Sequence, residues 1–98
     1  MAQIQSTQEF TDWLDGLRDL RGRARIQARI ERLARGNLGK YRNLKHGVSE
    51  LKVDVGPGYR VYYTRRRDTL IILLCGGDKS SQRSDIRRAY KLVDELEL

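Results

Sequence analysis

The apolar positions near the N-terminus recur with helical spacing. They lie at i, i+3, i+4 and i+7, which is typical of one buried stripe on an α-helix, and they are Phe10, Trp13, Leu14 and Leu17. The preceding "STQE" (Ser6–Glu9) has the form of a capping box, so a helix is predicted to begin there. Ile4, just before it, is predicted to start a short strand.

A second helix is predicted after Gly22, where "DLRGR" interrupts the first pattern. Its buried stripe consists of Ile26, Ile30, Leu33 and Ala34. Gly36–Asn37 is a suitable C-terminal stop, because these residues tolerate left-handed backbone conformations. Two helices joined by a short turn indicate an antiparallel helical hairpin.

The pattern changes to strand-like alternation after a polar, irregular stretch from Asn37 to Val48. "SELKVDV" places apolar side chains on one face only, "GPG" forms a turn, and the next two strands are the polar-apolar Tyr59–Arg65 and the apolar Leu70–Cys75. A final helix is predicted over Ser81–Leu96. The sequence therefore predicts one α+β domain over residues 1–98, with a small, mainly antiparallel sheet whose helices pack on one face.

Composition narrows the class of protein. Of the 98 residues, 39% are hydrophobic, which is enough for one modest core. No apolar run reaches membrane-spanning length, and "MAQIQSTQEF" lacks the basic start and apolar centre of a signal peptide. The single cysteine, Cys75, cannot form an internal disulfide and is expected to be a buried small side chain. We therefore expect a cytoplasmic protein that does not associate with membranes.

Positive charge is the strongest compositional feature. Twenty Lys and Arg against thirteen Asp and Glu give a net charge of +7, which predicts an acidic partner. Residues 21–35 contain six Arg and one Glu. Three of these arginines, Arg25, Arg29 and Arg32, form a basic ridge beside the predicted apolar stripe. The ridge is either a solvated helix face or a surface for nucleic acid such as ribosomal RNA.

The strand "YRVYYT" raises a second question about charge. Because strand side chains alternate, Tyr59, Val61 and Tyr63 are expected in the core, and the opposite face carries Arg60 and Tyr62. That opposite face is either ordinary solvated sheet or a surface that meets an anion.

Several segments of the chain, taken together, match a known pattern. The helical hairpin, "ELKVDVGPGYRVYY", "IILLCGGDK" and the closing helix together resemble the RelE/ParE superfamily of bacterial toxins, especially the small HigB-like addiction module killer proteins. The resemblance implies a RelE-like fold and the toxin of a type II toxin–antitoxin module, with a helix-turn-helix antitoxin encoded by the adjacent gene. RelE-like members cut mRNA on the ribosome without metal or cofactor, and ParE-like members poison DNA gyrase.

The resemblance also assigns candidate site residues. The phosphate-binding strand arginine of RelE-like toxins falls on Arg60, two basic strand positions fall on Glu50 and Lys52, and the arginine after the last strand falls on Lys79. The catalytic tyrosine near the start of the last helix has no match, since Ile86 or a neighbour takes its place. The resemblance therefore implies a complete anion-binding half of a site and leaves the acid and base open.

Metal-free RNA cleavage needs a base for the 2′-hydroxyl, a cation for the phosphate and an acid for the leaving oxygen. Arg60 and Lys79 are the predicted cations. Glu50 is expected either to act as a base or to form a salt bridge with one of them. His46, in a basic loop expected near Glu50, is a candidate acid–base group or a solvated side chain.

Three further residues are predicted to contact RNA or the ribosome. Tyr62 either stacks on a base or is covered by the last helix, and Lys45 and Arg65 are candidates for phosphate contacts. The leading hypothesis is a metal-independent, ribosome-dependent mRNA endonuclease. The alternatives are a gyrase poison that acts by binding and a non-catalytic nucleic-acid-binding module.

Overall fold

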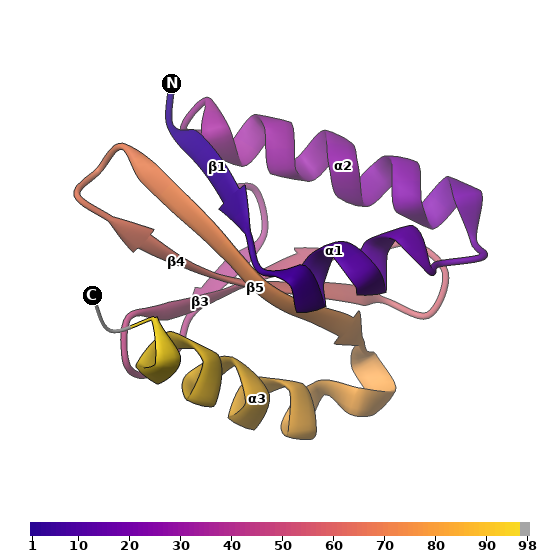
Figure 1. Cartoon of the computed structure of the whole chain (residues 1–98). Helices are drawn as coiled ribbons and strands as arrows, with labels where there is room; N and C mark the ends of the chain where they lie inside the picture. The colour runs from indigo at the N-terminus through magenta and orange to yellow at the C-terminus, as the bar shows by residue number, and fades with distance from the viewer. Residues whose placement is uncertain (97–98) are drawn as a thin grey trace.

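Five strands form one sheet in the order β1-β5-β4-β3-β2 in the computed structural model, which describes residues 1–96 (Figure 1). Strand β1 runs parallel to β5, and the other neighbouring strands are antiparallel. The elements in chain order are β1 (Gln3–Ser6), α1 (Gln8–Asp15), α2 (Leu20–Ala34), β2 (Tyr41–Asn43), β3 (Val48–Val53), β4 (Tyr59–Arg66), β5 (Leu70–Asp78), a 3-10 turn η1 (Lys79–Ser81) and α3 (Gln82–Glu95).

Both helices of the hairpin are capped by side chains. The Thr7 hydroxyl accepts a hydrogen bond from the Phe10 N–H at 3.0 Å, so α1 begins one residue later than the predicted Ser6 cap. The Asp19 carboxylate accepts from the Gly22 N–H at 2.9 Å and starts α2 at Leu20. Gly22 therefore lies inside α2 and does not interrupt it, which corrects the prediction.

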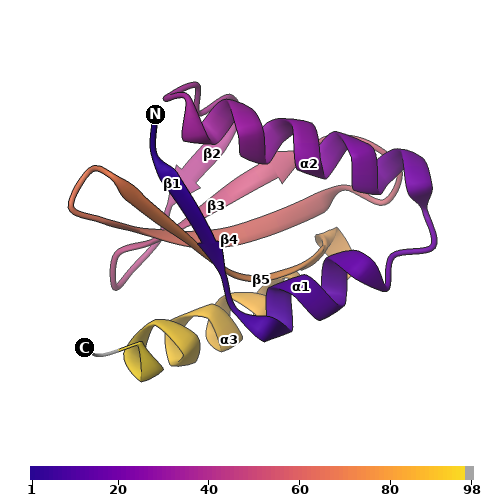
Figure 2. The ribbon, with the colours of Figure 1, turned by 45° about the horizontal axis from the view of Figure 1, so that its top comes forward.

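The helices cover both faces of the sheet (Figure 2). Helices α1 and α2 pack on the face that carries Val61 and Leu51, whereas α3 packs on the face that carries Tyr62 and Leu74. The prediction that all helices share one face is wrong, because the second face is also largely apolar and needs its own cover. Helix α3 supplies that cover with Ala89, Leu92 and Val93.

A register shift in the β4–β5 pair changes which side chains face α3. Tyr62 is opposite Cys75 but Tyr63 is opposite Leu73, so Leu74 is the extra residue of a bulge. The bulge reverses the alternation, and β5 continues three residues beyond the predicted end at Cys75. As a result a Cβ on Gly76 would collide with the Trp13 ring, and one on Gly77 would collide with the Asp85 carboxylate.

The predicted irregular stretch before β3 contains a short edge strand, β2, which sequence periodicity missed because three exposed residues carry no alternation signal. Between residues 1 and 96, no helix is both long enough and apolar enough to cross a membrane.

Candidate functional site

Arg60 is a buried cation on the sheet face that α3 covers. The residue is 7% exposed, so the face opposite Val61 carries it as predicted but does not leave it open to solvent. Its Nη1 donates to the carbonyl oxygens of Gly58 and Tyr59, both at 3.2 Å, and its buried Nε has no hydrogen-bond partner. Within residues 1–96 no carboxylate lies at ion-pair distance from the Arg60 guanidinium.

Two lysines lie close to Arg60. Lys52 is directly opposite Arg60 in the β3–β4 pair, so both side chains leave the sheet on the same face. Gly58 lies between Arg60 and the start of η1. If Gly58 carried a Cβ atom, that atom would be 3.4 Å from Arg60 Nη1 and 3.7 Å from Lys79 Cβ. Lys52 and the start of the Lys79 side chain therefore lie next to Arg60, and within residues 1–96 neither lysine forms an ion pair.

Asp85, which was not among the predicted site residues, lies beside the cross-strand pair of Arg60 and Gly77. Its carboxylate lies over Gly77, which is directly opposite Arg60 in the β4–β5 pair. The Ser81 hydroxyl donates to Asp85 Oδ2 at 2.6 Å and anchors it at the start of α3. Burial raises the pKa of the Asp85 carboxyl, and the charge of Asp78 adds to this, while the Ser81 hydrogen bond opposes it. The spacing Ser81 to Asp85, one helical turn, was the signal available in the sequence.

Glu50 is fully buried and has partners other than those predicted. Its Oε2 accepts hydrogen bonds from the Tyr62 hydroxyl at 3.0 Å and from the Gln82 side-chain amide at 2.8 Å. A guanidinium nitrogen of Arg42 lies 3.3 Å from Oε1, as an ion pair without hydrogen-bond geometry. The predicted salt bridge to Arg60 or Lys79 is therefore wrong, and a role as base stays a prediction.

Tyr62 is completely buried beneath α3. A ring in that position cannot stack on an RNA base, so the alternative prediction, that the last helix covers it, is confirmed. Burial, followed by the charge of Glu50, raises the pKa of the Tyr62 hydroxyl above its usual range. The Tyr62 hydroxyl, which donates to Glu50 Oε2, thus holds the Glu50 carboxylate in place from within the core.

His46 is not brought to this site. It lies in the β2–β3 turn with φ 59°, and its ring meets the edge of Tyr90 near the other end of α3, with ring centroids 4.9 Å apart. Val48 and Thr64 are the facing residues of β3 and β4 that lie nearest to His46. This pair is four residues, or about 13 Å along the strand, from the pair that contains Arg60. Lys45 adjoins His46, and its N–H donates to the Tyr90 hydroxyl at 3.2 Å.

Arg65 and the basic ridge of α2 lie away from Arg60. Arg65 is exposed near the far end of β4 and falls on the α2 side of the sheet by alternation. Arg25, Arg29 and Arg32 belong to α2, which covers the face opposite Arg60. Their predicted contacts with RNA stay predictions, and any such contacts would be made on a different side of the molecule from Arg60.

The described residues also bear on metal binding and on the cysteine. Residues 1–96 contain no group of three or more His, Cys, Asp or Glu side chains placed to hold a metal ion.

Cys75 is 4% exposed, as predicted for a small core side chain. Burial and the charges of Asp85 and Glu9 raise the pKa of its thiol to about 12, which makes it a poor nucleophile.

The five strands and three helices form an α+β fold that is consistent with a RelE-like fold. The family profile described as "Phage derived protein Gp49-like (DUF891)" matches residues 12–94, and the chain belongs to this toxin-like family. An uncharacterized protein from Haemophilus influenzae is 49% identical over 96 residues, covering 98% of this chain and 97% of its own length.

A solved structure supports the fold. The solution structure of the conserved hypothetical protein HP0894 from Helicobacter pylori is similar with a TM-score of 0.51. The similarity covers 82% of this chain and 97% of that one, at 20% sequence identity. At this identity the likeness concerns the fold alone.

Proposed function

We propose that the protein is the HigB-like toxin of a type II toxin–antitoxin module and that it cleaves ribosome-bound mRNA without a metal ion. Membership of a toxin-like family supports the general class and implies an antitoxin partner. The partner proposed is a helix-turn-helix protein encoded by the adjacent gene. The observation that carries the proposal is the buried Arg60 guanidinium, which has no counter-charge at ion-pair distance within residues 1–96.

A buried cation without an anion is costly, because it has lost hydration and gained no opposite charge. Lys52 and Lys79 beside Arg60 add repulsion between like charges. A phosphate group at this cluster would supply a negative charge beside the Arg60 guanidinium, which has no ion-pair partner within residues 1–96. The cluster is therefore suited to bind a phosphate, and a phosphate that gains charge in a transition state would be bound more strongly still.

The proposed reaction is transesterification within the RNA. The 2′-oxygen attacks the adjacent phosphorus and loses its proton to a base, the bond from phosphorus to the 5′-oxygen breaks, and that oxygen takes up a proton. The products are a 2′,3′-cyclic phosphate and a 5′-hydroxyl end. Arg60 and Lys79 would stabilise the negative charge on the pentacoordinate phosphorus.

Asp85 is the carboxyl that we propose as the proton donor to the 5′-oxygen. It lies across from Arg60 over Gly77, and its raised pKa favours the protonated state that a general acid requires. Glu50 is less suited to proton transfer, because two hydrogen bonds and the Arg42 ion pair already engage its carboxylate.

One observation favours a second candidate function. The tyrosine that RelE-like enzymes carry near the start of the last helix is absent here, and Ile86 at about that position packs against the core under α3. A toxin that poisons DNA gyrase by binding would not need that tyrosine. The cluster of cations around Arg60 favours cleavage, since a purely protein-binding surface has no need to bury one of them.

The two functions are separated by assaying the purified wild-type protein with 70S ribosomes and mRNA in magnesium buffer, which the ribosome and gyrase both need, alongside a gyrase supercoiling assay. We expect mRNA cuts, equal cutting by protein that was dialysed against EDTA beforehand, and gyrase activity that is unchanged. Arg60→Ala should cut about a hundredfold more slowly, equivalent to roughly 3 kcal/mol of transition-state stabilisation. Lys79→Ala should also be slower, with Lys79→Arg partly active because the charge persists.

Arg66→Ala is the matched control, because it removes an exposed arginine from the same strand outside the cluster. Its cleavage rate should equal that of the wild type. Intact mRNA together with inhibited supercoiling would replace the proposal with the gyrase function.

A further inference from the structure

A polar pocket of about 420 Å³ lies on the α1–α2 side of the sheet, beside the loop that follows α2. Its floor consists of three facing residues of neighbouring strands. Asn43 of β2 is opposite Ser49 of β3, and Ser49 is opposite Tyr63 of β4. Directly opposite residues point to the same side of a sheet, and Tyr63 belongs to the core under α2, so all three side chains leave the sheet on that side.

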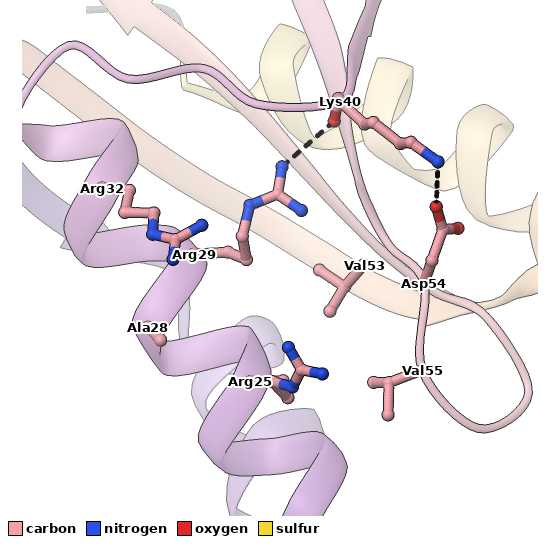
Figure 3. A pocket seen from close by; sticks show the side chains of 8 residues that line it. All are labelled: Arg25, Ala28, Arg29, Arg32, Lys40, Val53, Asp54 and Val55. Carbon is pink, nitrogen blue, oxygen red and sulfur yellow. Dashed lines mark hydrogen bonds and ion pairs between the residues drawn. The ribbon is translucent and has the colours of Figure 1, made fainter.

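The walls of this pocket are backbone segments that the fold holds in place. Gly36 and Leu38, in the loop after α2, form one wall. Arg29 ties that loop to the helix, because its Nη2 lies 3.3 Å from each of the Leu38 and Lys40 carbonyl oxygens (Figure 3 shows the bond to Lys40). Gly47, in the β2–β3 turn, lines the pocket as well. The pocket is therefore preformed, as binding sites for small molecules usually are.

The polar groups on the floor are fixed and can donate hydrogen bonds. The Ser49 hydroxyl donates to Asn43 Oδ1 at 3.0 Å, which orients the Asn43 amide and leaves its NH2 group as a donor. Tyr63 is 4% exposed. Burial raises the pKa of the Tyr63 hydroxyl, whereas hydrogen bonding by Ser49 and the charge of Arg65 oppose the rise. The Tyr63 hydroxyl is therefore protonated at neutral pH, and Arg65 lies near it.

Arg65 places a positive charge at one end of the pocket. It follows Tyr63 by two residues on the same side of β4, is exposed, and forms no ion pair within residues 1–96. Arg65 and Gly36 also line an adjoining pocket, which contains Arg35. Within residues 1–96, Asp68 is the only carboxylate that lines either pocket, against two arginines. This end therefore suits an anion with several acceptor oxygens, such as a phosphate group.

Tyr41 provides an aromatic ring at the other end. It precedes Asn43 by two residues in β2, so its side chain lies on the same side of the sheet. An ionised Tyr41 would raise the pKa of Tyr63 further, which places the two residues near each other. Tyr41 is 43% exposed, which is high for an aromatic side chain. An exposed ring at the edge of a polar pocket is a surface on which a planar base can stack.

We infer that this pocket binds a single nucleotide, with its base on the Tyr41 ring, its sugar and base edge at Asn43 and Tyr63, and its phosphate at Arg65. Tyr41 is level with Val61 across the sheet, so it lies two strands, or about 10 Å, and four residues, or about 13 Å, from Arg65. A nucleotide carries its aromatic base and its charged phosphate at opposite ends. This order matches the placing of the ring and the guanidinium at opposite ends of the pocket.

The same ligand chemistry is present in a free nucleotide and in an unstacked nucleotide of an RNA chain. The inference does not depend on the proposed function, because Arg60 is on the other face of the sheet. Since the cluster around Arg60 is itself proposed to bind phosphate, the test has to report the two sites separately.

The test follows the amide resonances of the purified full chain by NMR while AMP is added. Shifts of Gly36, Gly47 and Ser49 report this pocket, whereas those of Gly58 and Gly77 report the cluster around Arg60. We expect saturating shifts of the first set with a dissociation constant of about 1 mM. Arg60→Ala should leave these shifts unchanged, whether or not that variant is inactive in cleavage.

Two variants and two fragments of AMP separate the ends of the pocket. Tyr41→Leu should weaken AMP and adenosine about tenfold each and leave ribose 5-phosphate unchanged, because only the stacking contact is lost. Arg65→Gln should weaken AMP and ribose 5-phosphate about tenfold and leave adenosine unchanged. The matched control is Arg66→Gln, which removes the next exposed arginine of β4, on the other side of the sheet, and should bind like the wild type.

The trinucleotide ApApA, with a 5′-hydroxyl end, distinguishes the two sources of the ligand. Tighter binding than AMP, with the same dependence on Tyr41 and Arg65, would identify a nucleotide within an RNA chain. Tighter binding of AMP would identify a free or 5′-terminal nucleotide, and either result supports the site. The inference is overturned if about 10 mM AMP leaves Gly36, Gly47 and Ser49 unshifted. It is also overturned if Arg65→Gln weakens adenosine as much as AMP, or if Arg66→Gln weakens AMP as much as Arg65→Gln does.

Discussion

The two faces of the sheet bury different kinds of side chain. The ten buried residues under α1 and α2 are all apolar or aromatic. Under α3, a second apolar cluster shares its face with the three buried polar or charged residues of the described chain, Glu50, Arg60 and Thr64. One face of the same three central strands therefore buries apolar and aromatic side chains, and the other also buries two charged ones, Glu50 and Arg60.

This difference is informative about function because buried charge seldom stabilises a fold. The transfer of a guanidinium or carboxylate from water costs several kcal/mol, and even a good ion pair repays that cost only in part. Glu50 has an ion-pair partner within the protein, whereas within residues 1–96 the Arg60 guanidinium has only the Gly58 and Tyr59 carbonyls as hydrogen-bond partners. The comparison thus singles out Arg60 as the residue whose burial the proposed phosphate ligand would explain.

The largest change in stability is expected on the α1–α2 face. Leu33→Ala should lower the free energy of unfolding by about 2–5 kcal/mol, because Leu33 is fully buried and its removal leaves a cavity. Leu20→Ala, on the same helix, is the matched control, since Leu20 is 72% exposed and its loss should change stability by less than about 0.5 kcal/mol. Urea denaturation measures both. Equal effects of the two substitutions would contradict the assignment of Leu33 to the core.

A smaller loss is expected from Glu50→Ala on the α3 face. This change leaves the buried Tyr62 hydroxyl without its acceptor and should cost about 1–3 kcal/mol. In a Tyr62→Phe background the same substitution should cost less, because the donor is already absent. A double-mutant cycle by urea denaturation gives the coupling between the two residues, and a coupling of zero would show that Glu50 does not support Tyr62.

Arg60→Met, unlike Glu50→Ala, should not lower the free energy of unfolding. It replaces an unpaired buried cation by an apolar side chain of similar length, so the free energy of unfolding should stay the same or rise by about 1 kcal/mol. The cleavage rate should fall as for Arg60→Ala. A marked loss of stability would show instead that the Arg60 contacts to the Gly58 and Tyr59 carbonyls hold the turn together, and that its burial is structural.

Sequence periodicity predicted the α1–α2 face well. The core positions Tyr59, Val61, Tyr63 and Phe10 are buried as expected, and the rest of the Phe10 stripe packs against them partly buried. The start of α2 was missed, although Asp19 three residues before Gly22 was an available capping signal.

The α3 face was harder to predict, for two physical reasons. Glu50 and Tyr62 form a polar pair across strands, and a single sequence does not show that each satisfies the other, so their face looked solvent-exposed. The bulge at Leu74 then reversed the alternation of β5 and brought Gly77, and with it Asp85, to the cluster. The resemblance to known toxins pointed to Arg60, Lys52 and Lys79, which are neighbours in the structure, whereas His46, suggested by spacing along the chain, lies against Tyr90.

The comparison of the two faces extends to a pair of tyrosines, each hydrogen-bonded to a carboxylate. The Tyr59 hydroxyl donates to Asp19 Oδ2 at 2.7 Å on the α1–α2 side, and the Tyr62 hydroxyl donates to Glu50 Oε2 at 3.0 Å on the α3 side. The hydrogen bond to Asp19, with burial, raises the pKa of Tyr59 to about 12. The stability that this bond contributes is therefore complete below pH 10, the usual pKa of tyrosine, and is lost as the pH rises toward 12.

Tyr59→Phe should accordingly produce the smallest change of the series at pH 7, because the Asp19 carboxylate can accept from water instead. The difference in free energy of unfolding between wild type and Tyr59→Phe should shrink further as the pH increases from 10 to 12, and urea denaturation at several pH values measures it. Tyr62 lies deeper, and burial dominates the rise in its pKa, so the corresponding difference for Tyr62→Phe should also begin to fall above pH 10 and should go on falling to a higher pH than for Tyr59→Phe. If the stability difference from wild type depends on pH in the same way for both variants, the two faces exclude water equally well from their tyrosine–carboxylate pairs. That result would contradict the comparison.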